Sequence, residues 1–571
     1  MLTSNEIRTK FLEFFKQRGH AVVPSSALVP EGDISVLFTT AGMQQFKPYY
    51  TNPGDAEKDF GGKNTVSVQK CVRTGDIDEV GDATHLTFFE MLGNFSFGGY
   101  GRKEAITYAH DFIKKELGLE ISYVTFYKGE GVVPRDEESE KIWKELGVAD
   151  IREDGKDVFW GPTGDSGPCG PTTEIYCKNA TGQDVEIWNI VFNEYFAGSS
   201  REKLDKGEAT LKKLDTLGID TGMGLERLLA TVQKKESVFD TDLFTEIFGK
   251  IDEFTQSKND RARRILADHV RTAVFMISDG VVPGNGGRGY VLRRILRRAI
   301  RFADVLSIKH VALFHLANTV IEKYQDIYSL IRANKRMVLD EIEKEESKFR
   351  QTLEHGMKEF EKGTDPFILA TTYGFPIELT VELAEEKGIK IDIDDFNTKM
   401  AEHQKLSQTA SAGMFKGGLA NHEPKTIKLH TAHHLLLAAL QEVLGKEVKQ
   451  RGSNITEERL RIDFAFDRKM TDEEKKRVED IVNEKIREDL TVVRREMPRD
   501  EALKLGAEME FGAKYPETVS VYFIEDKNGN AISKEFCGGP HVEHTGELGA
   551  FKLQKEEASS QGVRRIKAVL L

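Results

Sequence analysis

The sequence predicts a multidomain α+β protein, and three observations support this prediction. The chain has 571 residues, and because single hydrophobic cores rarely grow past a few hundred residues, about three or four domains are expected. From about residue 35 to 225, short strand-like runs alternate with turns rich in Gly, Pro and Asp. From about residue 240 to 410 the apolar residues follow a helical period, and after about residue 425 strand and helix patterns are mixed.

Four strand-like runs mark the first region. Their alternation with turn residues is typical of a mixed or antiparallel sheet with helices around it. In chain order the runs are SVLFTT (35–40), NTVSVQKCVR (64–73), HLTFFEML (85–92) and VEIWNIVF (185–192).

The middle region contains two helices with clear apolar stripes. The stripe within 336–360 predicts a long packed helix and consists of Leu339, Ile342, Phe349, Leu353, Met357 and Phe360. Residues 288–302 combine an apolar face with six arginines and no acid, namely Arg288, Arg293, Arg294, Arg297, Arg298 and Arg301. Two interpretations of this arginine-rich side stay open: a contact with nucleic acid, or a solvated face paired with surface acids.

The bulk composition narrows the functional classes. A net charge of −13 argues against general nucleic-acid binding, although a local basic patch can override this average. No run reaches the roughly 18 to 20 apolar residues of a membrane span, and the N-terminus lacks a signal-peptide pattern. The four cysteines form no CxxC pair, which suits a reducing compartment. We therefore expect a cytoplasmic protein without membrane contact.

The last region carries a candidate metal site. Strand-like runs at 459–466 and 518–524 flank a helix pattern at 472–488. His430 and His434 share one helix face in HTAHH, and CGGPH supplies Cys537 and His541. A thiolate and three imidazoles suit a tetrahedral zinc ion, and the glycines allow a tight turn around it. A packed cluster without metal is the alternative, and His433 and His544 are expected to be non-ligands.

A second constellation suggests a site that forms adenylates. In DTGMGLERLLA, Gly222 and Gly224 allow close backbone approach, and Arg227 begins an apolar helix where it could meet a triphosphate. Arg73 lies on one strand-like run, and the aromatic pair Phe88 and Phe89 lies on the next. Two arginines and an aromatic face for adenine fit ATP. The alternative is a β-hairpin with phenylalanines in the core.

These motifs are part of a longer resemblance. The sequence resembles the bacterial alanyl-tRNA synthetases, a family of class II aminoacyl-tRNA synthetases, over nearly its whole length. The matching segments include IRTKFLEFFKQRGH, LFTTAGMQQFKPYY, TFFEMLGNFSFG, GPTGDSGPCGPTTEIY, DTGMGLER, RGYVLRRILRRA, HTAHHLLLAAL and CGGPH.

The resemblance implies a reaction and roles for individual residues. Alanine and ATP would give alanyl-adenylate, and the alanyl group would pass to the 3′ end of tRNA(Ala). Arg73 and Arg227 match the ATP-binding arginines, and Asp220 matches the carboxylate that holds the α-amino group of alanine. Residues lining the alanine pocket are matched by Trp160, Asn189 and Val191. Magnesium is implied by the ATP chemistry, without assigned ligands.

The resemblance also implies three domains. These are a class II catalytic domain with an antiparallel sheet (1–240), a helical domain that recognises the tRNA acceptor stem (241–415), and an α+β zinc-binding editing domain (416–571). Editing is the known remedy where a pocket cannot reject serine or glycine well enough. The zinc ligands would be His430, His434, Cys537 and His541, which together leave the metal no open position.

Acceptor-stem recognition is implied for the arginine-rich helix. Arg293, Arg294, Arg297 and Arg298 are expected to meet tRNA phosphates. Asn285 matches an asparagine that reads the acceptor-stem G·U pair, whereas Thr371 stands where the family has an aspartate.

Other departures affect the expected architecture. The loop RTGDIDEV is shorter than its family counterpart and lacks a lysine, and CGGPH replaces CGGTH. The segment before HTAHH is short, so a small barrel is expected to be missing. The sequence ends where the family continues into a C-terminal domain to which dimer contacts are attributed, so we expect a monomer.

Two hypotheses compete with an alanyl-tRNA synthetase that edits. One is a catalytically silent tRNA-binding paralogue, which the intact ATP and alanine residues oppose. The other is a zinc hydrolase that only deacylates mischarged tRNA, and such a hydrolase would have no use for a complete ATP site.

Overall fold

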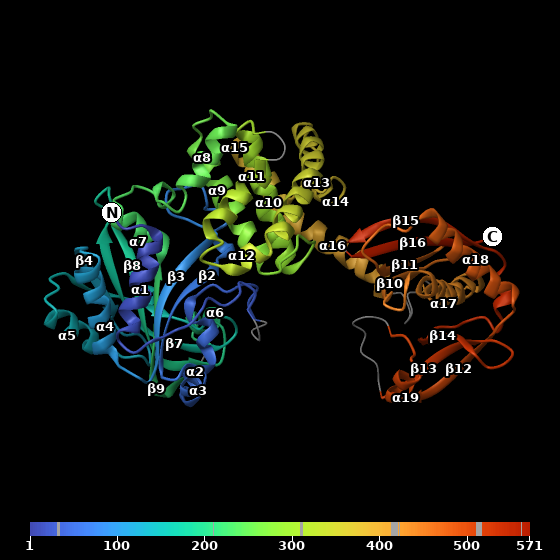
Figure 1. The fold of residues 1–571 in the computed structure, drawn as a ribbon, viewed down its shortest axis with the longest axis horizontal. Helices are drawn as coiled ribbons and strands as arrows, with labels where there is room; N and C mark the ends of the chain where they lie inside the picture. Colours follow the sequence, from blue (N-terminus) through green and yellow to red (C-terminus); the bar gives the residue numbers. More distant parts are fainter. Residues whose placement is uncertain are drawn as a thin grey trace. The chain divides into compact units, whose positions relative to one another are not determined.

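The computed structural model describes residues 1–30, 35–208, 210–308, 312–412, 419, 421, 423–509, 517–560 and 562–571. They form two compact units, Met1–Ile391 and Asp392–Leu571 (Figure 1). The boundary expected after residue 240 lies inside the first unit, and the one expected after residue 415 lies outside the described residues. The division into three domains stays a prediction.

A nine-stranded sheet forms the centre of the first unit. Its order is β1-β2-β3-β9-β8-β7-β4-β5, with β6 paired to β7. All neighbours from β2 to β4 in this order are antiparallel, and only the outer pairs β1/β2 and β4/β5 are parallel. The predicted antiparallel sheet is confirmed. The strands are β1 Ala21–Val22, β2 Asn64–Val72, β3 Phe88–Phe97, β4 Ile121–Tyr127, β5 Ile151–Asp154, β6 Phe159–Trp160, β7 Gly167–Lys178, β8 Asp184–Ala197 and β9 Leu211–Gly224.

Three of the four strand-like runs form β2, β3 and β8, but the run at 35–40 does not form a strand. This run places Phe38 in the core. The Thr39 N–H donates to the carbonyl of Leu28, and the Thr39 carbonyl accepts a hydrogen bond from the Val72 N–H. Its apolar residues therefore reflect burial of one side chain, and the expectation of a strand there was wrong.

Helices surround this sheet, and the later ones form a group beside it (Figure 1). The predicted long helix is confirmed as α13, whose stripe is buried apart from the half-buried Met357. The helices are α1 Ser4–Lys16, α2 Lys47–Thr51, α3 Pro53–Phe60, α4 Arg102–Asp111, α5 Glu137–Glu145, α6 Arg201–Asp205, α7 Leu225–Val232, α8 Thr245–Phe254, α9 Asp260–Ser278, α10 Gly287–Val305, α11 Ala312–Tyr324, α12 Ser329–Ala333, α13 Lys335–Glu361, α14 Pro366–Thr371 and α15 Ile377–Glu386.

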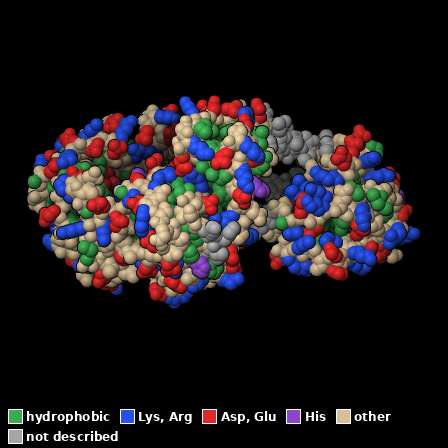
Figure 2. All heavy atoms as spheres, turned by 90° about the horizontal axis from the view of Figure 1, so that it is seen from above, with side chains coloured by type: hydrophobic (Ala, Val, Ile, Leu, Met, Phe, Trp, Pro, Cys, Tyr) green, Lys and Arg blue, Asp and Glu red, His purple; other side chains and the backbone are tan. Residues whose placement is uncertain are grey.

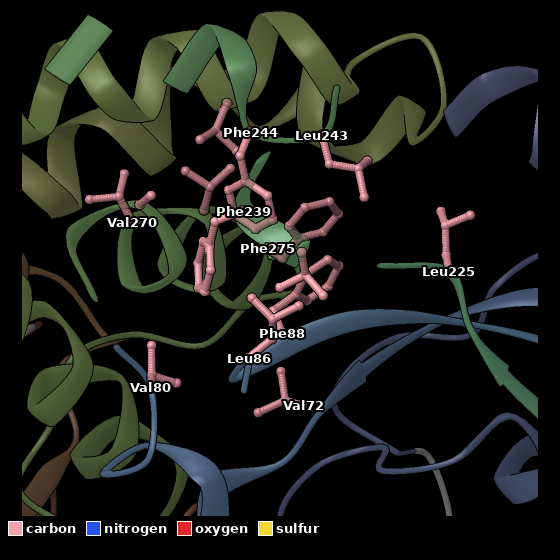
Figure 3. Close-up of a cluster of buried hydrophobic side chains, with 14 of the residues drawn as sticks. Val72, Val80, Leu86, Phe88, Leu225, Phe239, Leu243, Phe244, Val270 and Phe275 are labelled. Carbon is pink, nitrogen blue, oxygen red and sulfur yellow. The ribbon is translucent and has the colours of Figure 1, made fainter. Parts of the chain in front are cut away.

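One hydrophobic core joins the sheet to the later helices. Phe88 of β3 stacks on Phe275 of α9, with ring centroids 3.9 Å apart. Figure 3 shows this pair among Phe239, Phe244 and Val270. The sheet and the helical region therefore share a core within the first unit.

The second unit contains two smaller sheets and three long helices. The sheets have the orders β10-β11-β16-β15 and β12-β13-β14, and every paired strand is antiparallel. The predicted elements at 459–466, 472–488 and 518–524 are confirmed as β11, α18 and β13. The bounds are α16 Ile393–Ala412, α17 Pro424–Leu444, β10 Gln450–Ile455, β11 Leu460–Ala465, α18 Asp472–Arg487, β12 Thr491–Pro498, α19 Arg499–Lys504, β13 Thr518–Glu525, β14 Ala531–Phe536, β15 Phe551–Ser560 and β16 Val563–Leu570.

The surface is mixed in charge. On the face drawn in Figure 2, Lys and Arg side chains lie among Asp and Glu side chains. Among the described helices, none is long and apolar enough to cross a membrane.

Candidate active site and candidate metal centre

A cavity of about 340 Å³ opens on the large sheet. It gathers most of the predicted ATP and alanine residues, although they are far apart in the sequence. Those that line it are Arg73, Phe89, Trp160, Asn189, Val191, Asp220 and Arg227.

The pairing of β8 with β9 builds the floor of this cavity. Val191 lies opposite Asp220, and Asn189 lies opposite Gly222. Directly opposed residues project to the same face of a sheet, so these side chains converge. A Cβ atom at Gly222 would lie 3.0 Å from the sulfur of Met91, so a side chain there would require the Met91 side chain to shift.

Asp220 is a buried carboxylate without a donor. Its side chain is 5% exposed, and no described residue donates a hydrogen bond to it. Burial raises the pKa of its carboxyl to about 8. A cation at this position would restore the charged form, because an opposite charge favours the carboxylate.

Asn189 offers a second buried acceptor, and Glu174 fixes its direction. The Asn189 amide nitrogen donates to Glu174 Oε1 at 2.9 Å, whereas Asn189 Oδ1 is buried without a partner. Tyr176 donates to the other Glu174 oxygen at 2.9 Å. Burial, and then the neighbouring Glu186, raises the pKa of Glu174 to about 7. The sequence analysis missed Glu174; its only signal was an acid inside the strand-like run TTEIY.

The aromatic and basic residues of the predicted ATP site also line the cavity. The Arg73 guanidinium stands 4.9 Å from the ring centroid of Phe89. Arg227, in the first turn of α7, is exposed and lies 3.4 Å from Glu186. Phe88 is different, because neighbouring residues of a strand face opposite ways. It is fully buried against Phe275 (Figure 3), so its assignment to the ATP site is corrected to a core residue.

Buried ion pairs lie behind the cavity. Glu226 lines it and accepts a hydrogen bond from Arg271, while Arg8 pairs with Glu90. All four side chains are at least nine-tenths buried. Buried charges of this kind are stable only as pairs, so this network ties α1, β3, α7 and α9 together.

The arginines of α10 have acidic partners inside the first unit. Arg293 and Arg297 both contact Glu345, at 3.3 and 3.0 Å. Arg294 contacts Asp78 at 2.6 Å, and Arg298 contacts Glu382 at 2.9 Å.

For Arg298, burial excludes both interpretations of the arginine-rich side, the contact with nucleic acid and the solvated face. Arg298 is 3% exposed, so its assignment to tRNA phosphates is corrected: a phosphate cannot reach it without unpacking α10. Exposed Asn285 accepts a hydrogen bond from Arg293, and exposed Thr371 bonds to its own helix. The proposed roles of Asn285, Arg293, Arg294 and Arg297 in tRNA binding stay predictions.

The candidate metal ligands come together in the second unit. His430, His434, Cys537 and His541 each offer one ligand atom, and these atoms all lie within 4.8 Å of one another. Helix α17 carries the first two on one face, Cys537 directly follows β14, and His541 lies four residues later. The sulfur is 3.3 Å from His430 Nε2 and 3.5 Å from His541 Nε2.

Neighbouring groups fix the orientation of these imidazoles. His430 Nδ1 donates to the carbonyl of Pro540 at 3.0 Å, so its Nε2 keeps a lone pair for a metal. His541 Nδ1 meets the Thr431 hydroxyl at 3.1 Å, and His434 Nδ1 lies 3.4 Å from Glu535. Pro540 lacks an N–H, yet its carbonyl oxygen serves as the acceptor that orients His430.

The backbone approaches the metal centre closely at Gly539. A Cβ atom there would lie 2.8 Å from His430 Cε1, which explains a glycine at this position. His433 is buried beside the cluster and forms a further group with His434 and Glu535, whereas His544 is exposed.

Sequence comparisons agree with this architecture. Residues 6–448 match the family described as tRNA synthetases class II (A), and residues 519–567 match the family described as threonyl and alanyl tRNA synthetase second additional domain. The fold is thus that of a class II aminoacyl-tRNA synthetase.

Relatives that match the chain over its whole length narrow the assignment within this class of enzymes. The alanine–tRNA ligases of Borreliella afzelii and Treponema denticola are both 46% identical over 100% of this chain, and the alignments cover 100% and 99% of those proteins. That of Dehalococcoides mccartyi is 35% identical, and 80% of its length is covered. The chain belongs to the alanyl-tRNA synthetase family.

Proposed function

We propose that this protein joins alanine to tRNA(Ala) at the expense of ATP and hydrolyses wrongly charged tRNA at a zinc site. The observation that carries the first part is the pair of buried acceptors in one cavity, Asp220 and the Oδ1 atom of Asn189. Both lack a donor among the described residues. An α-ammonium group supplies the missing charge and hydrogens.

The walls around these acceptors select a small amino acid. Val191 lies opposite Asp220 in the strand pairing, and Trp160 lines the same cavity. A methyl side chain would rest against this apolar wall. The wall excludes bulky side chains but discriminates poorly against the smaller glycine and against serine, which adds only a hydroxyl.

Arg73, Phe89 and Arg227 form the proposed ATP side. Phe89 offers a ring face to adenine, and the two arginines offer charge to the phosphates. The alanine carboxylate attacks the α-phosphorus, pyrophosphate leaves, and alanyl-adenylate forms. Class II synthetases use Mg²⁺ with ATP; we assign no residue to it.

The second step transfers the alanyl group to tRNA. A ribose hydroxyl at the tRNA 3′ end attacks the carbonyl carbon, its proton is lost, and AMP leaves. Positioning and charge stabilisation, rather than a strong general base, supply the catalysis. For this step we retain the proposed regions 1–240 for catalysis, 241–415 for acceptor-stem recognition and 416–571 for editing.

The four-residue cluster fits zinc as its resident metal. A thiolate and three imidazoles in one small volume are a usual zinc donor set. His430, His434, Cys537 and His541 would hold the ion, and when bound it would supply a fixed positive charge next to the ester of the tRNA. Pro540 and Thr431 orient two of the ligands.

Two assays on the wild-type protein test this function. ATP–pyrophosphate exchange should be fastest with alanine, weaker with serine and glycine, and near background with threonine. Deacylation should then be faster for Ser-tRNA(Ala) than for Ala-tRNA(Ala). A silent paralogue would show no exchange, and a pure hydrolase would show deacylation alone; either result would refute the proposal.

A further inference from the structure

The loop between β2 and β3, residues 73–87, forms one wall of the cavity. It contributes Arg73, Asp76, Thr84, His85 and Leu86 to the lining. The two strands pair up to Val72 and Phe88, and one further backbone hydrogen bond, from the Arg73 N–H to the carbonyl of Thr87 at 3.0 Å, extends the hairpin. Residues 74–86 have no strand pairing. Other contacts must therefore hold this wall in place.

Two arginines of α10 provide such contacts. Arg294 Nη2 lies 2.6 and 2.7 Å from the two carboxylate oxygens of Asp78. Arg298 donates to the carbonyl of Ile77 at 2.7 Å and points a second N–H to the carbonyl of Val80 at 3.4 Å. The planar guanidinium presents its N–H groups to both backbone acceptors in a fixed fork, whereas a lysine ammonium has no such fork.

Helix α9 fixes the end of the same loop. Asp268 accepts a hydrogen bond from the Thr87 N–H at 3.0 Å, and His269 lies between Asp268 (2.8 Å) and Arg298 (3.0 Å). Val80 and Leu86 belong to the hydrophobic cluster that also contains Val270 (Figure 3). The loop is thus held against the helical region at Ile77–Val80 and again at Leu86 and Thr87.

The two arginines differ in how firmly they are fixed. Arg298 is 3% exposed and pairs with Glu382 of α15 at 2.9 Å. Arg294 is less buried, and its partner Asp78 is largely exposed. Arg298 therefore has one fixed position, whereas the pair of Arg294 and Asp78 can be altered without opening the core.

We propose that Arg294 and Arg298 are positioning residues for alanine activation: they hold the β2–β3 loop so that Arg73 and the loop side chains meet ATP. This inference rests on the proposed ATP site. It gives α10 a role that needs no tRNA, because Arg294 and Arg298 act through the loop on the formation of alanyl-adenylate.

The exchange reaction isolates that step, since it proceeds without tRNA. Arg294→Ala and Asp78→Ala should each raise the KM for ATP by about threefold to tenfold, as expected for a pair of about 1 kcal/mol. The KM for alanine should change less than twofold. The charge swap Arg294→Asp with Asp78→Arg should recover much of the loss, which identifies the pair itself as the cause.

Arg298→Lys tests the second contact. It keeps the charge next to Glu382 but loses the fork, so the KM for ATP should rise while the alanine KM is again little changed. If this variant does not fold, the Arg294 and Asp78 variants still decide the matter. Arg336→Ala is the matched control, because Arg336 pairs with exposed Asp340 on α13 at 2.8 Å and does not touch the loop.

The alternative role of Arg294 predicts a different result. If Arg294 binds tRNA phosphate, Arg294→Ala should leave exchange unchanged and reduce the slope of log K against log salt for tRNA binding by about 1. That outcome, or an Asp78→Ala variant with wild-type ATP KM, overturns the inference alone. A wild-type protein without alanine-dependent exchange refutes the proposed function, and the inference falls with it.

Discussion

A carboxylate buried without a donor is costly unless a ligand supplies the missing partner, and Asp220 is in this position. The Asn189 oxygen beside it is also unsatisfied, and Glu174 keeps the amide from turning that oxygen away. Unsatisfied buried acceptors are rare in native proteins. Two of them in one cavity therefore indicate what is bound there, a cation with several hydrogens.

Replacing Asp220 by asparagine should severely impair alanine activation. Asn keeps the size of the side chain but removes the counter-charge, so we expect kcat/KM for alanine in pyrophosphate exchange to fall by about 10²- to 10³-fold. Asp215→Asn, in the same strand but outside the cavity lining, is the control. Exchange within threefold of wild type would contradict the role given to Asp220.

The pH profile of the wild-type enzyme gives an independent check. The pKa of Asp220 lies at about 8, so below this value most of the free enzyme has the neutral acid, which cannot pair with an ammonium group. The kcat/KM for alanine should therefore rise by up to about tenfold per pH unit between pH 6 and 8 and then level off. The Asp220→Asn variant should lack this rise. A flat wild-type profile would be inconsistent with the raised pKa.

A functional residue can be recognised in the sequence when its type and its spacing from similar residues are themselves unusual. The spacing of His430, His434, Cys537 and His541 identified a cluster that the fold brings together. Glu174 was missed because one acid in a strand does not reveal what it bonds to. Phe88 was misassigned because Phe88 and Phe89 point to opposite faces of β3, and the sequence does not say which of these faces α9 covers.

At the scale of elements, the period of the apolar residues predicted where helices and strands form. The roles of the polar side chains on these elements depended on contacts with other elements. The stripe of α13 was enough to predict a packed helix. The arginines of α10 could not be interpreted from their own helix, since Asp78, Glu345 and Glu382 come from distant segments. Helix α10 therefore serves as an internal support at Arg298, whereas both expectations had placed its arginines on an outer face.

Glu382 should be important for the stability of this support. It contacts Arg298, Arg261 and Arg301 at 2.9, 3.0 and 3.4 Å. Glu382→Gln should lower the free energy of unfolding by about 3–5 kcal/mol at pH 7, because buried arginines lose their counter-charge. Urea unfolding would measure this. Glu354→Gln on α13, which removes an exposed pair with Lys358, should cost less than about 1 kcal/mol.

The contacts of Glu382 with the three arginines also predict the direction of a pH effect. Burial alone would raise the pKa of Glu382, but the three arginines outweigh it and hold the pKa below its usual value. A depressed pKa in the folded state stabilises the protein above the pKa of the unfolded chain, and this stabilisation is lost as the pH falls. The difference between wild type and Glu382→Gln should therefore shrink below about pH 4.5. A difference that grows on acidification would contradict the assignment.

At the scale of the whole molecule, the two candidate sites lie in separate compact units. The cavity is built from residues of Met1–Ile391, and the metal cluster from residues of Asp392–Leu571. All of these residues belong to one chain. The expected monomer stays a prediction.

This separation makes the metal centre testable by removing one ligand. Cys537→Ala eliminates a thiolate and the link between α17 and the segment after β14. We expect the purified variant to contain no zinc, whereas the wild type holds one ion per chain. Ser-tRNA(Ala) deacylation should fall to the uncatalysed rate, and alanine-dependent exchange should stay within about twofold, because the two sites are built from different compact units and share no residue.

A second cysteine separates loss of metal from loss of a buried thiol. Cys177 is buried in β7 of the first unit, so Cys177→Ala should reduce stability but keep one zinc and normal deacylation. If zinc also stabilises the fold, Cys537→Ala and chelator-treated wild type should both show an earlier melting transition of the second unit, since metal binding contributes to folding. A Cys537→Ala variant that retains zinc, or one that deacylates Ser-tRNA(Ala) at the wild-type rate, would show that this cluster is not the editing centre.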